Sequence, residues 1–512
     1  ALQHLMATTF TVPFEGWRPD SPAFRNPGLV DATNVIPRGN SYGPFKALVA
    51  SSSNALTAAA LGSVSATDVS GNSYVYAGDA TKLYELLAGA FNDESVGGGY
   101  ATATDDVWEF AVWTKNNKII ATNYTDHVQS MTVGGGAAGA FANMITTTDK
   151  PKAKHIGIVG RFVVLGNTND TTDGQKLSRV WWSGIDDELD FSPSAATQCD
   201  FEDLSSGGEV KKIVGGADYG LIFQSGMVRT MRYIGGGAIF DLQPLNFAPG
   251  TPIANSVIGY KGDVFYISED GFMALRGTQV ERLGNDRVDR KFWSTFDINN
   301  RRYLSAGIDP VNKLVCWAFP GESSSSSLPN KIFIYNFQED KWAQADVSTE
   351  IIVQTTTQGY TLDSLDTLGT SIDNAAIFDQ SFDADKWKGG AFRFGAFDQT
   401  HKLGLFNGSS LAFSIDTGDL SPMDNGRNWQ INWVRPLIDG SGDIESGVKI
   451  AKRQRLMDSV SYPANAAILN ENGRCMVRSD GKYQRIRFSD SGASSWTHLQ
   501  GLEVSYELRG WR

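Results

Sequence analysis

Cysteine, histidine and charged residues are scarce in this chain of 512 residues. There are three cysteines and five histidines, and charged residues make up 20% of the sequence. Cys199, Cys316 and Cys475 are odd in number and far apart, so we expect reduced, buried thiols in a protein made in a reducing cytoplasm. The sequence has no CxxC or HxxxH spacing, and we expect no metal and no cofactor.

Long hydrophobic runs and an excess of basic residues are also missing. No apolar stretch reaches the ~18 residues that a helix needs to cross a bilayer, so we expect no membrane-spanning segment. The N-terminal ALQHLMATTF lacks a basic region followed by an apolar core, so we expect no signal peptide. The net charge of −12 argues against a protein whose whole surface binds DNA, because phosphate binding needs clustered Lys and Arg.

Glycine and aromatic residues, by contrast, are abundant. The chain contains 54 glycines, 28 Phe, 16 Tyr and 13 Trp beside 17 prolines. The glycines follow no fixed period, which excludes a collagen-like chain. This composition is typical of many short strands joined by tight turns. The length allows about two to four domains, or one large all-β domain with appendages.

Between residues 51 and 420, alternating apolar and polar segments are paired across Gly, Asn and Asp turns. The pairs are 73–86, 109–123, 160–184, 218–235, 262–284, 312–346 and 402–418. Their turns, GDAT, KNNK, SEDG and NGSS among them, are typical of β-hairpins. A repeated sheet unit predicts an all-β fold with a β-propeller-like core, with an array of sandwiches or barrels as the alternative. Val288, Phe292 and Phe296 predict one short amphipathic helix within it.

The N-terminal residues 1–50 differ from this core. They hold six of the 17 prolines, which favours an extended arm with strands near Val30–Ile36 and Phe45–Val49. The arm needs a surface for its aromatic side chains, either on its own domain or on a neighbouring subunit. These side chains are Phe10, Phe14, Trp17 and Phe24.

Residues 421–512 predict a C-terminal β-sheet or sandwich region of opposite charge. From Asn425 onwards there are 13 Lys and Arg and nine Asp and Glu, a net of +4 that leaves −16 for the rest. One predicted hairpin carries basic residues that alternate along its strands and therefore share a face. They are Arg474, Arg478, Lys482, Arg485 and Arg487. This face is either a solvated surface or a contact for an acidic neighbouring subunit, with DNA as a less favoured partner.

Two patterns imitate functional sites but fit turns better. Gly39–Gly43 matches GxSxG, yet Pro44 and a strand pattern follow it, whereas a hydrolase nucleophile needs a strand-to-helix elbow. Asp186, Asp187, Glu188 and Asp190 cluster in WWSGIDDELDFSP without the alternation of calcium-loop ligands. We therefore expect no catalytic residues and no enzyme activity, although carboxylates distant in sequence can still meet in a propeller channel.

Three segments taken together resemble one family. DATNVIPRGNSYGPFKAL (31–48) resembles an early strand segment of tail proteins from short-tailed bacteriophages. YGLIFQSGMVRTMRYIGG followed by VIGYKGDVFYISEDGFMAL (219–275) resembles their propeller core. GKYQRIRFSDSGASSWTHLQGLEVSYELRGWR (481–512) resembles their closing segment, in which a basic strand precedes a W-x-H-x-Q-G-[VLI] turn, here Trp496–Leu502, and a final strand. The family is the tail nozzle, also called tail tubular protein B, hub or packaged-DNA stabilisation protein.

The resemblance implies a structural virion protein that acts in the phage tail after assembly in the host cytoplasm. Such proteins form a homo-hexameric ring below the portal and its adaptor, and their partners are other tail proteins and the genomic DNA that passes through the lumen without sequence-specific binding. Low charge and many aromatic residues suit large permanent interfaces. The subunit-interface candidates are Phe14, Trp17, Arg18, Phe24, Arg38, Arg485, Arg487 and Trp496.

Two further expectations follow from these patterns. If the arm holds a neighbouring subunit, deletion of residues 1–48 should spare the folding of the propeller and impair assembly. The alternative function is a propeller-type glycan-binding protein or glycoside hydrolase of a phage tail. It is suggested by the acidic cluster and by Trp181 and Trp182.

Overall fold

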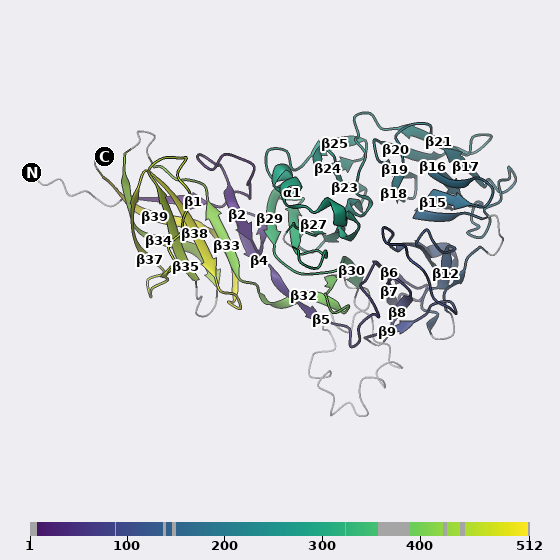
Figure 1. Cartoon of the computed structure of the whole chain (residues 1–512), viewed down its shortest axis with the longest axis horizontal. Coiled ribbons are helices and arrows are strands. Elements are labelled where there is room, and N and C mark those ends of the chain that lie inside the picture. The colour runs from purple at the N-terminus through teal and green to yellow at the C-terminus, as the bar shows by residue number, and fades with distance from the viewer. Residues whose placement is uncertain are drawn as a thin grey trace, which may run out of the picture.

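The computed structural model of the chain shows an elongated molecule with two lobes (Figure 1). It describes residues 8–87, 89–136, 140–145, 150–322, 324–356, 390, 392–422, 427–440 and 446–509. A round lobe lies on the right of Figure 1, and a flatter lobe on the left carries both ends of the chain. The fold is all-β, with a propeller in one lobe and a sandwich in the other.

The round lobe is built from four-stranded antiparallel blades. Blade 1 contains β6 (Gly62–Thr67), β7 (Ser73–Gly78), β8 (Leu83–Leu87) and β9 (Ala90–Asp93). Blade 2 contains β10 (Glu109–Trp113), β11 (Lys118–Thr122), β12 (Gln129–Thr132) and β13 (Ala142–Asn143). Blade 3 contains β14 (Lys152–Val159), β15 (Phe162–Asp170), β16 (Gly174–Trp182) and β17 (Asp200–Asp203). Blade 4 contains β18 (Val210–Val214), β19 (Tyr219–Gln224), β20 (Val228–Tyr233) and β21 (Phe240–Pro244).

The remaining blades complete a circle. Blade 5 contains β22 (Ile258–Tyr260), β23 (Asp263–Ser268), β24 (Gly271–Arg276) and β25 (Gln279–Arg282). Blade 6 contains β26 (Ser305–Asp309), β27 (Leu314–Phe319), β28 (Lys331–Asn336) and β29 (Lys341–Ala345). Blade 7 contains β30 (Ile352–Thr356), β31 (Phe392–Phe397), β32 (Leu403–Ser410) and, as its outer strand, β5 (Lys46–Ala50).

The first strands of the blades contact one another in order around the axis. β6 contacts β10, β10 contacts β14, and β14 contacts β18; the 3-10 turn η3 (Ala254–Ser256) links β18 to blade 5, and β22, β26, β30 and β6 follow in turn. The contacts return to the strand at which they began, so the described residues form a closed propeller of seven blades. This architecture confirms the predicted propeller-like core.

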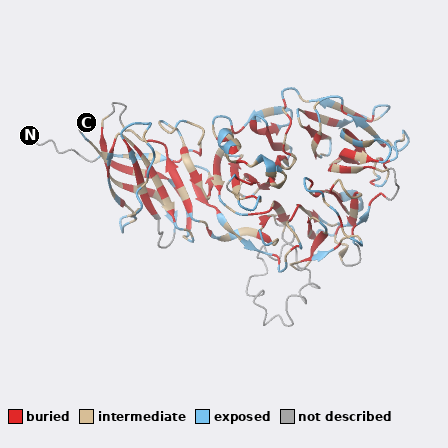
Figure 2. Cartoon of the chain, viewed as in Figure 1, coloured by how far each residue is buried: buried red, intermediate tan, exposed pale blue. Residues whose placement is uncertain are grey.

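Burial explains why the blades have this sequence pattern. The middle strands lie between neighbouring blades and are buried on both faces, so β27 reads as the continuous apolar run LVCWAF. Smaller apolar clusters fill the spaces between blades, as with Tyr76 and Ile119 between blades 1 and 2. Buried segments run through the middle of both lobes in Figure 2. The blades are therefore held together by side-chain packing between sheets.

The flatter lobe is a sandwich of two mainly antiparallel sheets. The first has the order β3 (Val35–Arg38), β4 (Ser41–Pro44), β39 (Trp496–Leu508), β34 (Trp429–Gly440) and β37 (Cys475–Gly481), with β1 (Thr8–Pro13) also pairing with β39. The second has the order β2 (Leu29–Thr33), β33 (Phe413–Thr417), β38 (Tyr483–Asp490), β35 (Ser446–Arg453) and β36 (Ala467–Ile468). β2 also bridges in parallel to β29 of blade 6, which joins the sandwich and the propeller in one sheet.

The N-terminal segment belongs to both lobes and is not a separate arm. β1 to β4 are strands of the sandwich, and β5 closes blade 7 by pairing with β32. The propeller thus spans 46–410, and the sandwich combines 8–44 with 413–508. These limits replace the expected divisions 1–50, 51–420 and 421–512, because the two chain ends pair with each other and with blades 6 and 7.

Three predicted local elements differ from the structure. The basic hairpin expected between Arg474 and Arg487 does not form, because β37 pairs with β34 in the first sheet and β38 pairs with β33 and β35 in the second. The expected hairpin 402–418 does not form, because β32 belongs to blade 7 and β33 to the sandwich, and NGSS lies inside β32. The expected turn at Trp496–Leu502 is the first half of the strand β39, which pairs with β34. The amphipathic helix is confirmed as α1 (Asp289–Thr295), with Val288, Phe292 and Phe296 buried.

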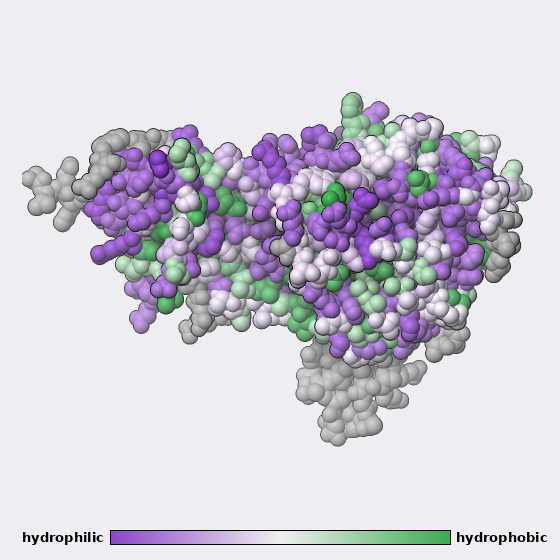
Figure 3. Space-filling model, in the orientation of Figure 1, coloured by the Kyte–Doolittle hydropathy of each residue, from purple (hydrophilic) through white to green (hydrophobic). Residues whose placement is uncertain are grey.

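The surface of the molecule is mixed. Figure 3 shows a mainly hydrophilic face with hydrophobic patches scattered over both lobes. Within the described residues, no helix has the length and apolar character needed to cross a membrane. The three cysteines are buried and free of disulfides, as expected.

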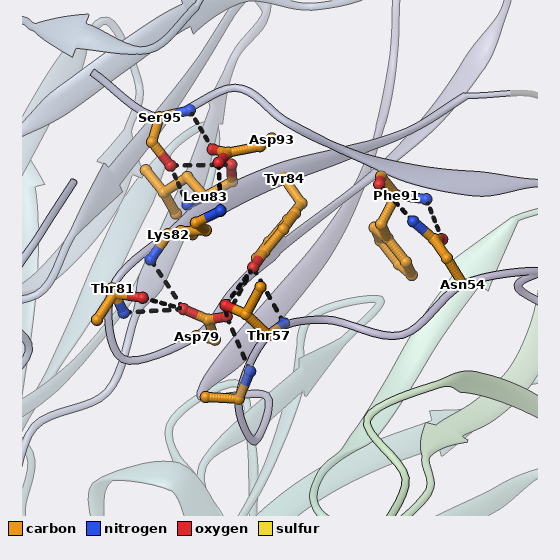
Figure 4. Close-up of polar contacts among 11 residues, drawn as sticks. Asn54, Thr57, Asp79, Thr81, Lys82, Leu83, Tyr84, Phe91, Asp93 and Ser95 are labelled. Atoms are coloured by element: carbon orange, nitrogen blue, oxygen red, sulfur yellow. Dashed lines mark hydrogen bonds and ion pairs between the residues drawn. The ribbon is translucent and has the colours of Figure 1, made fainter. Parts of the chain in front are cut away.

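A short turn motif recurs between the second and third strands of several blades. In blade 1, Asp79 Oδ1 accepts from the backbone N–H groups of Thr81 and Lys82, each at 2.8 Å (Figure 4). Its Oδ2 accepts from the hydroxyls of Thr57 at 2.8 Å and Tyr84 at 2.7 Å. Asp170 of blade 3 and Asp398 of blade 7 make the same Asx turn to the residue two positions on. The shared D-x-T pattern is a repeat signature that marks these hairpins.

Candidate functional site

The main candidate site is a cavity of ≈480 Å³ at one mouth of the propeller axis. Its lining comes from the segments that begin the inner strands of blades 2 to 6. It includes Asp105, Val107, Lys154, His155, Glu209, Lys211, residues 252–255, and Ile298, Asn299, Arg301 and Arg302 of the 3-10 segment η4 (Ile298–Tyr303). A second cavity of ≈230 Å³ shares Val107, Asn255 and Arg302 with it and extends among the inner strands.

A buried carboxylate ties three blades together beside this cavity. Glu109 of β10 is 4% exposed, and its Oε1 lies 2.8 Å from His155 Nδ1 of β14 and 2.9 Å from Lys212 Nζ of β18. Its Oε2 accepts from the backbone N–H of Ile156 at 3.3 Å. Burial raises the pKa of Glu109, but Lys212 and His155 outweigh burial and lower the pKa to about 2. Glu109 is therefore ionised at neutral pH and holds blades 2, 3 and 4 together.

The rest of the cavity wall has more unpaired cations than anions. Lys154 is paired with Asp106 and Lys211 with Glu209, each at 2.6 Å. Glu209 also accepts from Asn167 Nδ2 at 2.9 Å, so both of its oxygens are used. Among the described residues, no carboxylate pairs with Arg301 or Arg302. His155 Nε2, in the wall, is buried without a hydrogen-bond partner in the described structure.

Neighbouring cations hold two carboxylates at the cavity, Glu109 and Glu209, in the ionised form. Glycoside hydrolysis needs one carboxyl group with a raised pKa to act as the general acid. Burial raises the pKa of Glu209, but Lys211 more than compensates and lowers it, as Lys212 and His155 do for Glu109. Neither Glu109 nor Glu209 therefore has the raised pKa of a general acid.

The aromatic interface candidates lie mostly inside their own chain. Phe14 and Trp17 are 1% exposed and Trp496 is 3% exposed. Trp17 packs edge-on against Phe333 of blade 6 with ring centroids 4.9 Å apart. The chain's own core buries these three side chains, as in the alternative in which the N-terminal aromatic residues pack on their own domain, and a role at a subunit interface stays a prediction.

The remaining interface candidates are half-buried and make contacts within the chain. The ring of Phe24 packs edge-on against Tyr483 at 5.3 Å. The side chain of Arg38 covers Gly43, where an added Cβ would lie 2.8 Å from it. Arg18 is half-buried beside Gly28, whose added Cβ would lie 3.4 Å from its Cγ.

The predicted basic face is divided between the two sheets, because β37 with Arg478 lies in one and β38 with Arg485 and Arg487 lies in the other; acids of a neighbouring segment neutralise the two arginines of β38. Arg485 pairs with Asp419 at 3.2 Å, and Arg487 pairs with Asp416 at 2.7 Å. Arg474 stacks on Trp433 with its Cζ 4.2 Å from the ring centre. These acids come from β33 and the residues after it, a segment that the sequence pattern assigned to the hairpin 402–418.

The two imitations of functional sites are turns, as expected. Ser41 lies in the hairpin between β3 and β4, and its hydroxyl donates to the carbonyl of Arg38 at 2.8 Å. Asp186 pairs with Lys115 at 2.9 Å and with Arg161, and Glu188 accepts from Asn116 at 2.6 Å. Nowhere in the described chain do three His, Cys, Asp or Glu side chains come together as metal ligands would.

Sequence reasoning missed the buried group of Glu109, His155 and Lys212. Each is an ionisable residue beside buried apolar positions of its strand, in EFAVW, KAKHIGIV and VKKIV. That placement is the available signal, because a charge entering a buried strand needs a partner. Which of these residues contact one another depends on how the seven blades close into the propeller, and no single hairpin reveals that arrangement.

Comparisons with known proteins add no assignment. No family model and no curated protein matches the chain. The β-propeller domain of Cps50 (Swd1) from Myceliophteria thermophila is 10% identical, with 64% of this chain and 95% of that domain covered at a TM-score of 0.29. A nidogen/laminin complex is 10% identical over 53% of this chain and 93% of that chain, with a TM-score of 0.30. An exo-β-1,3-galactanase from Phanerochaete chrysosporium is 9% identical over 88% and 100%, with a TM-score of 0.27. Likenesses this weak carry no argument about function, and the strand pairing of the chain itself defines the propeller.

Proposed function

We propose that the chain is the structural subunit of a bacteriophage tail nozzle, which forms a hexameric ring that retains the viral genome and conducts it during ejection. The observation that carries the proposal is the polarity of the long molecule. One end is a sandwich edge with exposed apolar side chains, and the other is a propeller edge with exposed carboxylates. Different surfaces at opposite ends favour oriented, head-to-tail contacts over symmetric pairing.

The sandwich end exposes apolar side chains on its outermost segment. Five of the 14 large hydrophobic side chains exposed in the described structure lie between residues 456 and 476. They are Leu456, Met457, Val460, Ile468 and Met476. β37, which carries Met476 and the exposed Arg478, is an edge strand of its sheet. Exposed apolar side chains beside an open strand edge are typical of a surface that another protein covers.

The opposite end of the molecule is acidic. β17 is the outer strand of blade 3, and its Asp200, Glu202 and Asp203 are exposed. β17 and β37 lie at opposite ends of the long axis in Figure 1. In the proposed tail, one such end faces the portal-adaptor ring and the other faces the next tail component.

The three segments that resemble nozzle proteins lie in both lobes. Residues 31–48 form the connection between the sandwich and blade 7, residues 219–275 lie in blades 4 and 5, and residues 481–512 include β38 and β39. The likeness therefore spans the architecture and is not confined to one module. This spread supports the proposal.

The conduit in this proposal lies between copies of the chain. The axial cavity of one propeller, at ≈480 Å³, has the size of a small-molecule pocket and not of a duplex channel. The glycan alternative has less support, because Trp181 and Trp182 are 6% and 4% exposed and have no free face for a sugar ring.

The test is the mass of the purified full-length chain in solution, alone and with its adaptor. We expect one closed multi-subunit species that Met457→Glu and Met476→Glu shift toward monomer. Val69→Glu is the matched control, because Val69 is as exposed as Met457, at 82%, but lies in blade 1. A chain that stays monomeric with its adaptor, or variants that assemble like the control, would contradict the proposal.

A further inference from the structure

The axial cavity has a chemistry that neither the fold nor the proposed ring requires. Its lining contains four permanent cations, Lys154, Lys211, Arg301 and Arg302, from three separate segments. Its acids are Asp105 and Glu209; Glu209 is bonded to Lys211 and Asn167, and Lys154 is bonded to the adjoining Asp106, so the two arginines carry the unpaired positive charge. In a chain with a net charge of −12, this concentration of cations in one concave site points to an anionic ligand.

The two arginines are the groups most available to such a ligand. Arg301 is exposed at the cavity, and its guanidinium has no hydrogen-bond or ion-pair partner within the described residues. Arg302 donates to the hydroxyl of Tyr303 and covers its ring, with the guanidinium Cζ 4.3 Å from the ring centre. That contact orients the guanidinium and leaves most of its five donors unused. Lys211 spends one of its three donors on Glu209.

We propose that the axial cavity binds a small molecule through a phosphate group, with Arg301, Arg302 and Lys211 as its ligands. Phosphate carries more charge than a carboxylate and presents several oxygens, so it matches several cations that converge from different segments. Guanidinium groups bind such oxygens in pairs of parallel hydrogen bonds. The volume of ≈480 Å³ leaves room for the organic part of the molecule, as in pockets for ligands of nucleotide or sugar-phosphate size.

The buried group beneath the cavity makes this a preformed site. Glu109 fixes His155 and Lys212 and joins the inner strands of blades 2, 3 and 4. The wall that carries Lys154 and Lys211 is therefore rigid before a ligand arrives. A preformed wall loses little conformational entropy on binding.

Isothermal titration calorimetry of the full-length chain with glucose 6-phosphate and inorganic phosphate tests the proposal. We expect saturable binding of glucose 6-phosphate that weakens at least about tenfold in Arg301→Ala and in Lys211→Ala, because each variant removes a charge-assisted hydrogen bond to the phosphate. Arg455→Ala is the matched control, because Arg455 is an exposed arginine in the sandwich that touches no part of the cavity. It should bind like the unmodified chain.

Other outcomes would overturn the proposal. The proposed site would be contradicted if neither phosphate probe bound, or if Arg455→Ala weakened binding as much as the cavity variants do. A single-stranded oligonucleotide that binds through Arg301 while glucose 6-phosphate does not would show that the cavity contacts a nucleic-acid backbone. Because none of these readouts depends on ring formation, failure here leaves the nozzle proposal standing, and failure of the ring leaves this site testable.

Discussion

The propeller and the sandwich use similar strands at very different sequence separations. Blades 1 to 6 are each formed by four consecutive strands, so their pairing is local. The sandwich pairs the two ends of the chain, as where Thr8 lies opposite Tyr506 and Tyr42 opposite Leu499. The difference teaches that the N-terminal segment is the link on which both lobes depend. It supplies strands to the sandwich and the closing strand of blade 7.

The N-terminal segment also contributes side chains to a hydrophobic core that the two lobes share. One apolar cluster contains Phe14 and Trp17 of the N-terminal segment, Trp342 of blade 6 and Phe488 of the sandwich. Polar contacts follow the same path: the Tyr42 hydroxyl donates to the carbonyl of Trp342 at 3.1 Å. The two lobes should therefore lose structure together when this segment is disturbed, whereas disturbance within a blade should stay local.

Deletion of residues 1–50 should have the largest effect. It removes β1 to β5, opens blade 7 and exposes the shared core, so we expect the loss of cooperative thermal unfolding followed by circular dichroism. This reverses the expectation from sequence that the propeller folds without the segment. A truncated chain that retained the melting transition of the full chain would refute the link.

Trp17→Ala should destabilise the protein by about 3–5 kcal/mol, the usual cost of truncating a large buried aromatic side chain. Chemical denaturation measures the change, and hydrogen exchange should rise in both lobes. Phe247→Ala is the control, since Phe247 is 97% exposed and its truncation should stay within about 0.5 kcal/mol. Faster hydrogen exchange in the sandwich alone would show that the stability of the propeller does not depend on this core, and would contradict the account.

Glu109→Gln should cost on the order of 3 kcal/mol at neutral pH, because it removes the carboxylate that pairs with the half-buried Lys212 and the buried His155. The increase in hydrogen exchange should be confined to blades 2 to 4. The folded pKa of Glu109, about 2, lies below the ordinary 4.5, so its stabilising contribution is present above pH ~4.5 and is lost as the pH falls toward ~2. The stability difference between the two proteins should shrink over that range. A constant difference would show that the charge of Glu109 is not its source.

Asp289→Asn at the start of α1 should give the smallest effect, with the opposite sign. Burial raises the pKa of Asp289 to about 6, so ionisation at neutral pH lowers stability. Asparagine keeps an oxygen that can accept from the backbone N–H of Phe272, now at 3.0 Å from the carboxylate. We expect slight stabilisation above pH ~6 that disappears as the pH falls toward 3.8, measured by urea unfolding. Destabilisation at neutral pH would mean that the helix N-terminus needs the charge.

The sequence predicts strand pairing between neighbouring segments well and pairing between distant segments poorly. Six of the seven hairpins expected between residues 51 and 420 form, because their turns and alternating strands are contiguous. The hairpin at 402–418 fails because β32 pairs with β5 and β33 pairs with β2, both hundreds of residues away. Alternation was equally compatible with either pairing, since it fixes the faces of a strand but not its neighbour.

The candidate site was beyond prediction for a related reason. Glu109, His155 and Lys212 come from three blades and meet only when the ring closes. The common face of Arg485 and Arg487 was correctly predicted, but the acids opposite them, Asp419 and Asp416, come from a strand region placed elsewhere. Trp17 is an example among the aromatic residues. The sequence indicates that its side chain must be buried, but not whether its own chain or a neighbouring subunit buries it.

Electron cryo-microscopy of the purified full-length chain with its adaptor tests the central claim most directly. The account predicts a closed ring of copies around a lumen wide enough for duplex DNA, with the seven-bladed propeller and the sandwich of each copy in the arrangement described here. Single chains that bind no adaptor, or a ring with no through-going lumen, would contradict it.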